Sequence, residues 1–200
     1  MVGVIDYGVG NIGSLTHALQ KQGIPVVVSK DIEVLKTCDG LLLPGVGAFR
    51  DGIGNIDQYG LRDFIVEFAQ TGKPIVGICL GMQLLYEEGK EYGTYKGLGL
   101  LKGSIEKIQG QRLPHMGWNE LVINKEDPLA NGLMADDHVY FVHSYYASSF
   151  GQEVVAYSDY YNKIPAIVRS GNIIGFQFHP EKSGGVGECL LRNLKEVFSC

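Results

Sequence analysis

The segment Pro74-Ile-Val-Gly-Ile-Cys-Leu-Gly-Met-Gln-Leu-Leu-Tyr-Glu-Glu88 joins an apolar run to helix-forming residues through a cysteine between two glycines. The run Pro74–Ile78 predicts a buried strand, and the run Met82–Glu88 predicts a helix. Between them, Gly77-Ile-Cys-Leu-Gly81 follows the pattern G-x-C-x-G. This pattern is the thiol counterpart of the G-x-S-x-G turn that presents a nucleophile between a strand and a helix. The stretch therefore predicts a strand–turn–helix unit with Cys79 at its turn.

Strand and helix signals alternate through the first half of the chain. Apolar or β-branched runs predict the strands, and apolar residues at i, i+3, i+4 and i+7 predict the helices. The predicted strands are Val2–Asp6, Pro25–Ser29, Leu41–Leu43 and Pro74–Cys79, and the predicted helices are Ser14–Gln22, Asp31–Thr37 and Leu61–Thr71. Ser14 is the expected N-cap of its helix, and Gly23 is the expected stop. Such alternation favours a parallel sheet with helices on both faces.

The second half is richer in strand signals and closes with a predicted helix, Val186–Phe198. The segments that favour strands are Gly103–Ile108, Trp118–Ile123, His138–Tyr146, Glu153–Tyr157, Ala166–Arg169 and Asn172–Phe178. The sequence contains no repeat, Ser/Pro-rich linker or low-complexity tract. We therefore expect one α/β domain over residues 1–200. It combines a mostly parallel central sheet, helices on both faces and an added antiparallel, strand-rich portion.

Composition excludes several classes of protein. Hydrophobic residues make up 45% of the chain, which rules out a disordered chain, and 17 basic against 22 acidic residues argue against a nucleic-acid-binding surface. The N-terminus lacks the basic residues of a secretory signal, and no apolar run is long enough to span a membrane. The four cysteines form no CxxC pair, so a reducing cytoplasm is the expected compartment. Cys38, Cys189 and Cys200 are expected to be small buried hydrophobic residues.

A glycine-rich segment near the N-terminus, Gly8-Val-Gly-Asn-Ile-Gly13, matches G-x-G-x-x-G and lies between a predicted strand and a predicted helix. In a dinucleotide site an acidic residue ends the next strand, about 20 residues further on. Here Asp31 falls beyond that strand, after Ser29 and Lys30. Three interpretations remain open for this segment: a dinucleotide site, a plain tight turn, or a surface that meets a partner or a substrate.

The setting of Cys79 favours catalysis over a structural role. A sharp turn needs small neighbours, and Gly77 and Gly81 supply them. The N-terminus of the following helix points N–H groups at the sulfur and favours its thiolate form. The N–H group of Leu80, directly after the nucleophile, is placed to donate to an oxyanion. The alternative is a buried cysteine at the end of a core strand.

A thiol nucleophile needs a base, and His179 is the best placed of the five histidines. It ends a predicted strand and is followed by Pro180 and Glu181. Residues two apart in an extended segment point to the same side, so Glu181 can accept from one ring nitrogen while the other faces Cys79. An ordinary histidine at a strand end is the alternative. Of the others, His17 is expected on a helix surface and His138 in a loop.

Together, these pieces resemble the class I (triad-type) glutamine amidotransferases. The segments that carry the resemblance are Gly77–Gln83, Phe176–Glu181 and Leu43–Gly47, in the order and spacing of that family. The resemblance implies that Cys79 is the nucleophile, His179 the general base and acid, and Glu181 the residue that orients His179. It also implies an oxyanion hole from the backbone of Leu80 with Val46 or Gly47, and a glutamine pocket bordered by Gln83, Ser144 and Tyr145. This chemistry needs no metal and no organic cofactor.

One branch of the family is especially similar, the glutaminase subunits of imidazole glycerol phosphate synthases. The likeness rests on Asp6–Asn11, Pro44–Phe49, Leu113–Asn119 and Tyr140–Tyr145. It implies a (β/α)8 cyclase subunit as partner, glutamine as substrate, and a structural role for His115. It places on the contact face Asn11, Trp118, Asn119 and Tyr140. Core packing is the alternative for the two aromatic residues, and His143 is expected to be structural because the reaction requires no second base.

Other functions stay open at this stage. They are a glutaminase that serves an anthranilate or pyridoxal phosphate synthase, a non-catalytic redox or chaperone-like α/β protein, and an α/β-hydrolase. The segment Leu113–Asn119 argues against the two other synthases. The order of His179 and Glu181 argues against a hydrolase, in which the acidic residue normally precedes the histidine. We also expect the peptide beside Val46 to flip at low cost, because Gly45 and Gly47 tolerate φ of either sign.

Overall fold

A computed structural model describes residues 1–198 of the chain. Within that range, eight strands form the main sheet in the order β2-β1-β3-β4-β14-β13-β12-β9. Neighbouring strands are parallel from β2 to β14 and antiparallel from β14 to β9. The strands are β1 (Val2–Ile5), β2 (Val26–Ser29), β3 (Gly40–Leu43), β4 (Ile75–Ile78), β9 (Val122–Ile123), β12 (Val154–Tyr160), β13 (Asn162–Ser170) and β14 (Ile173–Phe176).

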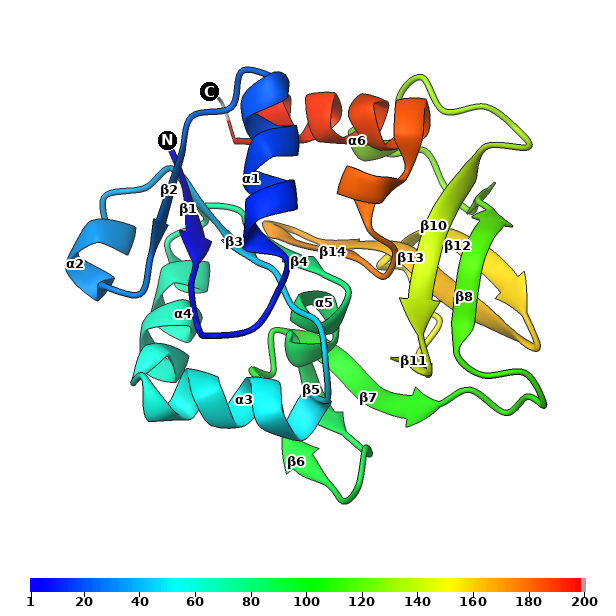
Figure 1. Cartoon of the computed structure of the whole chain (residues 1–200), viewed down its shortest axis with the longest axis horizontal. Coiled ribbons are helices and arrows are strands. Elements are labelled where there is room, and N and C mark those ends of the chain that lie inside the picture. Colours follow the sequence, from blue (N-terminus) through cyan, green and yellow to red (C-terminus); the bar gives the residue numbers. More distant parts are fainter. Residues whose placement is uncertain (199–200) are drawn as a thin grey trace.

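Helices cover both faces of this sheet (Figure 1). On one face α1 (Ile12–Lys21) and α6 (Gly184–Val197) pack on Val4 and Leu42. On the other face α3 (Phe49–Gln58), α4 (Leu61–Gln70) and α5 (Leu80–Leu84) pack on Leu41 and Leu43. Successive strand residues point to opposite faces, so each buried strand contributes to both cores. The short helix α2 (Ile32–Leu35) contributes Leu35 to the second core. The expected fold class is confirmed.

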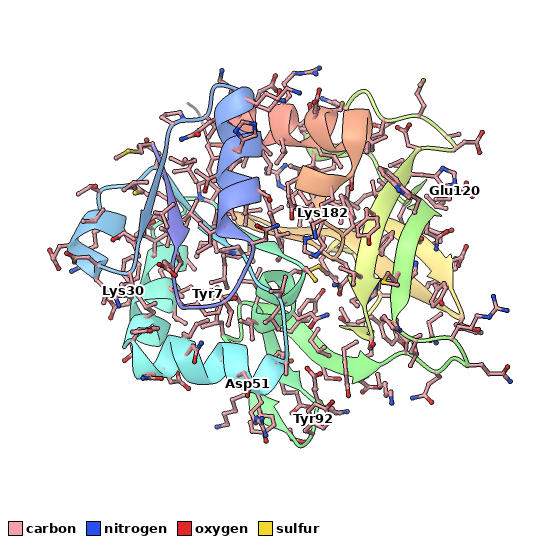
Figure 2. All side chains as sticks on the ribbon, viewed as in Figure 1. Tyr7, Lys30, Asp51, Tyr92, Glu120 and Lys182 are labelled. Carbon is pink, nitrogen blue, oxygen red and sulfur yellow. The ribbon has the colours of Figure 1, made fainter. Side chains whose placement is uncertain are left out.

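Two smaller sheets flank the main one. The first is an antiparallel ribbon of β8 (His115–Glu120) and β10 (His138–His143). The second has the order β11-β7-β5-β6 and contains β5 (Tyr86–Gly89), β6 (Tyr95–Lys96), β7 (Leu101–Lys107) and β11 (Tyr145–Ala147). Two 3-10 turns complete the fold, η1 (Pro128–Ala130) and η2 (Pro180–Lys182). Exposed Tyr92, between β5 and β6, projects from the lower edge in Figure 2.

The structure corrects several element boundaries. The helix expected over Met82–Glu88 ends at Leu84, and Tyr86 begins the strand β5 because its ring is fully buried. Helix α1 begins at Ile12 and is capped by the side chain of Asn11, not by Ser14. Helix α3 was not predicted, because Gly52 and Gly54 weaken its helical signal.

Two segments expected to be single strands are divided. The chain from His138 to Tyr146 pairs first with β8 and then, after Ser144, with β7. The segment Trp118–Ile123 likewise divides into the end of β8 and the separate strand β9. In each case the chain changes its partner strand, and a change of partner leaves no signature in a continuous strand-forming run.

The other cysteines differ in their burial, and the length and apolar character of the helices decide whether any of them could cross a membrane. Cys38 is buried as expected, whereas Cys189 is only partly buried and its Sγ lies 3.4 Å from the Asn131 carbonyl oxygen. Cys200 lies outside the described residues. None of the helices in the described range is both long and apolar enough to cross a membrane.

Candidate active site

Cys79 occupies a strained turn between β4 and α5, with φ 54° and ψ −111°. The residues two positions before and after Cys79 must be glycine, because the turn is pressed against neighbouring backbone. A Cβ atom on Gly81 would lie 1.8 Å from the carbonyl oxygen of Leu43, and one on Gly77 would lie 2.6 Å from the backbone of Met82. Contacts this short are sterically forbidden, so both glycines are required by the turn that presents Cys79.

His179 directly precedes η2 and Glu181 lies within it, shortly after the end of β14. Nδ1 of His179 is 2.9 Å from Oε1 of Glu181, and the two side chains are 2% and 3% exposed. His179 itself is extended, but Pro180–Lys182 forms a 3-10 turn, so Glu181 reaches the ring across a turn and not along the extended segment we expected. The Tyr140 carbonyl accepts from the backbone N–H of His179 at 3.0 Å, which fixes this turn to β10.

The electrostatic surroundings of His179 favour its protonated form. Burial alone would lower the pKa of this imidazole, but Cys79 and Glu181 outweigh burial and raise the pKa to about 9. Nδ1 is committed to Glu181, and Nε2 is buried without a hydrogen-bond partner among the described residues. Nε2 is therefore the nitrogen left for Cys79 and for a reacting group bound there.

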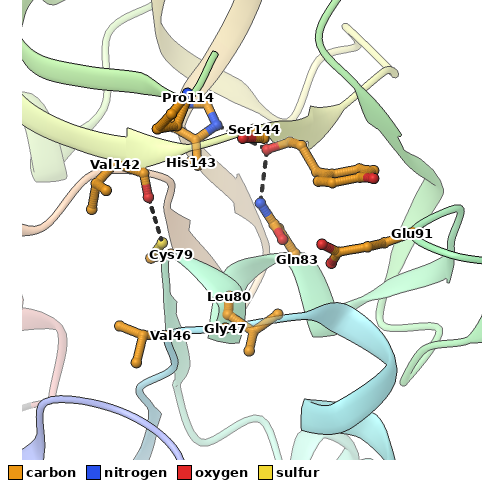
Figure 3. A pocket seen from close by; sticks show the side chains of 11 residues that line it. Val46, Gly47, Cys79, Leu80, Gln83, Glu91, Pro114, Val142, His143 and Ser144 are labelled. Atoms are coloured by element: carbon orange, nitrogen blue, oxygen red, sulfur yellow. Dashed lines mark hydrogen bonds between the residues drawn. The ribbon is translucent and has the colours of Figure 1, made fainter.

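A cavity of about 330 Å³ opens beside the Cys79 sulfur (Figure 3). It brings together residues that are distant in sequence and that we had predicted for three different roles: Val46, Gly47, Cys79, Leu80, Gln83, Ser144 and Tyr145. It is also lined by residues that we had not assigned to the pocket: Glu91, Pro114, Val142 and His143. Nothing in the described range gathers three His, Cys, Asp or Glu side chains in a way that could hold a metal ion.

Gln83 is held against the wall of this cavity. Its Nε2 donates to the carbonyl oxygen of Tyr145 at 2.8 Å and to Oε1 of Gln177 at 3.1 Å (Figure 3 shows the first contact). Nε2 of Gln177 lies 3.9 Å from the Cys79 sulfur, as does the Val142 carbonyl oxygen. Gln177 was not predicted as a site residue, although it lies two positions before His179.

Glu91 is a further carboxylate that sequence reasoning missed. It follows β5, beyond the run Met82–Glu88 in which a helix had been expected, and its Oε2 accepts from the backbone N–H of Phe49 at 2.7 Å. No local pattern marks it, because it reaches the cavity only through the pairing of β5 with its neighbours. It is the one acidic side chain among the residues described as lining the cavity.

The backbone around Val46 is turned away from an oxyanion-binding arrangement. The N–H of Leu80 donates to the carbonyl oxygen of Gly45 at 3.3 Å. In a trans peptide the N–H points opposite to the C=O, so the N–H of Val46 points away from Leu80. Tyr7 lies beneath this loop, and its hydroxyl donates to the Pro44 carbonyl. Gly47 has φ +106°, which favours glycine.

The glycine-rich segment after β1 packs beside the same loop. A Cβ on Gly10 would lie 3.4 Å from Pro44 Cβ and 3.5 Å from Gly45 N. The segment therefore supports the Gly45–Val46 peptide, a placement that favours the interpretation as a surface near the site. Burial and the neighbouring Cys79 raise the pKa of Tyr7 above its usual range, so its hydroxyl stays protonated and can donate to Pro44.

The residues expected at a partner surface lie on β8, on β10 and at the start of α1. On β8, Trp118 is 56% exposed, and its ring meets the edge of Tyr140 with centroids 6.1 Å apart. Trp118 therefore lies outside both cores, contrary to the core-packing alternative. The Asn11 side chain caps α1, and the Asn119 amide turns inward to His115 and Asp159. Lys182, labelled in Figure 2, lies 5.9 Å from the centroid of the Tyr140 ring.

Comparisons with known proteins agree with this geometry. The family model for glutamine amidotransferase class-I matches residues 3–195. Imidazole glycerol phosphate synthase subunit HisH of Oceanobacillus iheyensis is 51% identical over 98% of this chain and 99% of its own length. The subunit of the same name from Geobacillus thermodenitrificans is 49% identical over 96% and 93%. A crystal structure of a glutamine amidotransferase is 24% identical, with a TM-score of 0.79, over 100% and 99%, and supports the fold. The chain belongs to the class I glutamine amidotransferase family.

Proposed function

We propose that this chain is the glutaminase subunit of an imidazole glycerol phosphate synthase. It hydrolyses glutamine to glutamate and ammonia and passes the ammonia to a (β/α)8 cyclase subunit. The observation that carries the proposal is the convergence of Cys79 with the buried His179–Glu181 pair beside a cavity of about 330 Å³. The two full-length relatives named above carry the name of this synthase subunit, which supports this synthase over an anthranilate or pyridoxal phosphate synthase.

The first chemical step converts the glutamine amide to a thioester. The Cys79 thiolate attacks the amide carbon, and the carbonyl oxygen takes up the negative charge. Protonated His179, whose pKa is raised to about 9, gives the proton from Nε2 to the leaving nitrogen as the C–N bond breaks. Ammonia leaves and a Cys79 thioester remains. Glu181 accepts from Nδ1 and holds the ring in the orientation that this transfer requires.

The second step returns the enzyme to its starting state. Neutral His179 takes a proton from a water molecule, which attacks the thioester carbon. Collapse of the tetrahedral intermediate breaks the C–S bond, so glutamate leaves and Cys79 regains the thiolate beside the imidazolium. Glu91 supplies a negative charge within the cavity that is suited to the α-ammonium group of glutamine. Neither step requires a metal or an organic cofactor.

In the chain alone the oxyanion donor at Leu80 is already engaged. The Gly45 carbonyl accepts from that N–H, so an oxyanion has to displace it. A flip of the Gly45–Val46 peptide would free Leu80 and turn the Val46 N–H toward the substrate. One oxyanion donor is typically worth about 3 kcal/mol, roughly a hundredfold in rate. We propose that the partner favours the flipped peptide, so that glutamine is hydrolysed where ammonia is used.

The proposed contact face for the cyclase is the outer side of β8 and β10. Trp118 and Met116 are 56% and 65% exposed there, and the backbone of Tyr140 on β10 is bonded to the His179 turn. An exposed tryptophan and methionine on one strand are typical of a protein interface. Asn11 lies at the start of α1, near the loop that carries Val46.

The location and the extent of the domain are proposed as follows. A thiolate nucleophile favours the reducing cytoplasm as the location of the protein. We take residues 1–200 as one amidotransferase domain.

A single substitution tests the proposed function. In Cys79→Ser the fold is retained, but we expect glutamine-dependent synthesis with the cyclase to fall by several orders of magnitude, because a serine hydroxyl is far less ionised than a thiol. Synthesis from added ammonium should persist, since that route bypasses Cys79. The matched control is Cys189→Ser, which removes a thiol on α6 that does not line the cavity. Full glutamine-dependent activity in Cys79→Ser would exclude the proposed role.

A further inference from the structure

A second set of buried polar side chains runs back from the cavity wall, which His143 lines. His115 on β8 and His143 on β10 are cross-strand partners, and their side chains are almost completely buried. Nδ1 of His115 lies 3.0 Å from Nε2 of His143. The His115 ring is stacked between Phe141 and Tyr160, with centroids 4.4 Å and 4.0 Å away. Packing on both faces fixes this ring, so its nitrogens can point only where the structure places them.

The direction of every hydrogen bond in this set follows from the partners. Nδ1 of His143 lies 2.8 Å from the Tyr145 carbonyl oxygen, which can only accept, so this nitrogen carries the proton. Burial lowers the pKa of His143 to about 3 and of His115 to about 4, so both rings are neutral at pH 7. Nε2 of His143 must then accept, and Nδ1 of His115 must donate.

The outer end of the series is fixed at the backbone. Nε2 of His115 accepts from the Asn119 amide at 3.1 Å, and the same amide nitrogen donates to the Asp159 carbonyl at 3.1 Å. The amide oxygen of Asn119 accepts from the N–H of Glu120 at 2.9 Å, which excludes the reversed amide orientation. Each donor in this series therefore meets an acceptor, and the series has one direction, from Asn119 inward.

The inner end of the series is the Tyr145 carbonyl, where it meets Gln83. That oxygen accepts from His143 and from Nε2 of Gln83 at once. The second hydrogen of the Gln83 amide goes to Gln177, so only the amide oxygen of Gln83 remains available to a ligand. Reversal of this amide would place its oxygen against two acceptors. The orientation of Gln83 thus depends on a carbonyl that His143 holds in place.

We propose that His143 and His115 are positioning residues for glutamine binding. They hold the Tyr145 carbonyl, and through it the Gln83 amide, in the orientation that receives the substrate. This inference rests on the proposed function, and it deepens it by tying the glutamine pocket to β8, the strand that presents Trp118. Neither histidine takes part in proton transfer. Loss of the series should therefore weaken glutamine binding much more than it slows the chemistry.

Steady-state kinetics of glutamine hydrolysis in the complex with the cyclase tests the positioning role. In His143→Phe we expect the KM for glutamine to rise about tenfold, with kcat changed less than about threefold. His143→Asn, whose amide nitrogen replaces Nδ1 as donor to Tyr145, should recover most of the KM. His115→Phe keeps the stacked ring shape and should raise KM in the same direction. The control is Glu33→Gln on α2, whose side chain is 80% exposed and lies outside both the cavity lining and the proposed contact face, and it should leave both constants unchanged.

A second readout does not depend on activity. Long-range proton–nitrogen NMR spectra of the whole chain should show both buried rings neutral at pH 7, with the proton on Nδ1. A proton on Nε2 of either ring, or an unchanged KM in both His143→Phe and His115→Phe, would overturn the inference. A fall in kcat alone would assign the histidines a merely structural role and would also overturn it. If the unsubstituted complex hydrolyses no glutamine, the proposed function itself fails. If that complex is active but the KM is unchanged in His143→Phe and His115→Phe, only the positioning role fails.

Discussion

Cys79 combines a strained backbone with a committed hydrogen-bond environment. A non-glycine residue at such a φ costs about 1–3 kcal/mol, and the structure retains it because both backbone groups of Cys79 are bonded. Its N–H donates to the Phe176 carbonyl at 2.7 Å, and its carbonyl accepts from the N–H of Gln83 at 3.1 Å. The first bond ties the nucleophile to β14, the strand that leads to His179. The relative position of nucleophile and base is thus set by two adjacent strands of one sheet.

The pH dependence of catalysis follows from the surroundings of His179. Its pKa is raised to about 9 by Cys79 and Glu181, so the acid form needed for ammonia release is lost above that pH. We expect kcat/KM for glutamine hydrolysis in the complex to fall above about pH 9. In Glu181→Gln the carboxylate no longer stabilises the imidazolium, so this limb should move to lower pH. Glu181→Gln should also reduce the rate less than His179→Ala does, because Glu181 transfers no proton.

A pH–rate profile from pH 6 to 10 for both proteins checks this prediction. Asp137→Asn, a change of an acidic residue between η1 and β10, serves as control for the loss of one negative charge. A basic limb at the same pH in Glu181→Gln and the unsubstituted protein would contradict the role of Glu181. An equal loss of rate in Glu181→Gln and His179→Ala would contradict the ranking.

Site residues could be predicted where their signal lies in the adjacent sequence, and were missed where only the pairing of strands brings them to the site. Cys79 could be predicted because its glycine neighbours stand beside it, and His179 with Glu181 because they are two residues apart. Glu91 and Gln177 are single polar residues whose proximity to the cavity depends on strand pairing. Asn119 was expected to face a partner, but its amide is used by His115 and Asp159, which only the folded ribbon reveals.

Two elements, the β4–α5 turn and the Pro44–Gly47 loop, are built against each other. A Cβ on Gly81 would strike the Leu43 carbonyl, and one on Gly45 would lie 2.5 Å from the Tyr7 hydroxyl and 3.0 Å from Gly81 N. The nucleophile turn and the oxyanion loop therefore share one tightly packed backbone contact. The strand β4 and this turn could be predicted from alternation and glycine spacing. The end of α5 could not, because burial of Tyr86 in another sheet decides where the helix stops.

The contact at Gly81 gives a stability prediction. Gly81→Ala should lower the free energy of unfolding by about 3 kcal/mol or more, since the new methyl group meets fixed backbone and the turn has to move. Gly54→Ala is the matched control, because Gly54 is in α3 and a Cβ there has open space around it. Alanine in a helix is favoured over glycine by about 1 kcal/mol, so the control should be neutral or stabilising. Urea unfolding of both variants measures this difference, and equal stability would contradict the packing argument.

On the scale of the whole molecule, the catalytic groups lie where the parallel and antiparallel parts of the fold meet. Cys79 follows β4, and His179 follows β14, the strand at which the main sheet changes from parallel to antiparallel pairing. The parallel half could be predicted from alternating strand and helix signals. The antiparallel half could be predicted only as a set of strands, because the ribbon of β8 and β10 and the sheet of β7 and β11 share no local signal that tells which strands pair.

Buried neutral histidines make the stability of the whole chain depend on pH. The pKa of His115 is lowered to about 4 and that of His143 to about 3, whereas in the unfolded chain both are near 6.5. Below pH 6.5 the unfolded chain therefore binds protons that the folded chain does not, so the free energy of unfolding decreases as the pH is lowered. The slope approaches about 1.4 kcal/mol per pH unit for each ring. Melting temperatures measured from pH 7 to 5 should fall, and less steeply in His115→Phe than in the control His138→Phe. Equal slopes would contradict this.

We infer that this chain hydrolyses glutamine only slowly when it is alone, because the Gly45 carbonyl engages the Leu80 N–H. Initial rates of glutamine hydrolysis test it most directly, measured for the chain alone, with a (β/α)8 cyclase, and with the cyclase and its bound ligand. We expect a low rate for the chain alone and an increase of at least roughly a hundredfold in the ligand-bound complex, because the flip makes the N–H groups of both Leu80 and Val46 available and one such donor is worth about a hundredfold. Equal turnover in the three samples would contradict the claim.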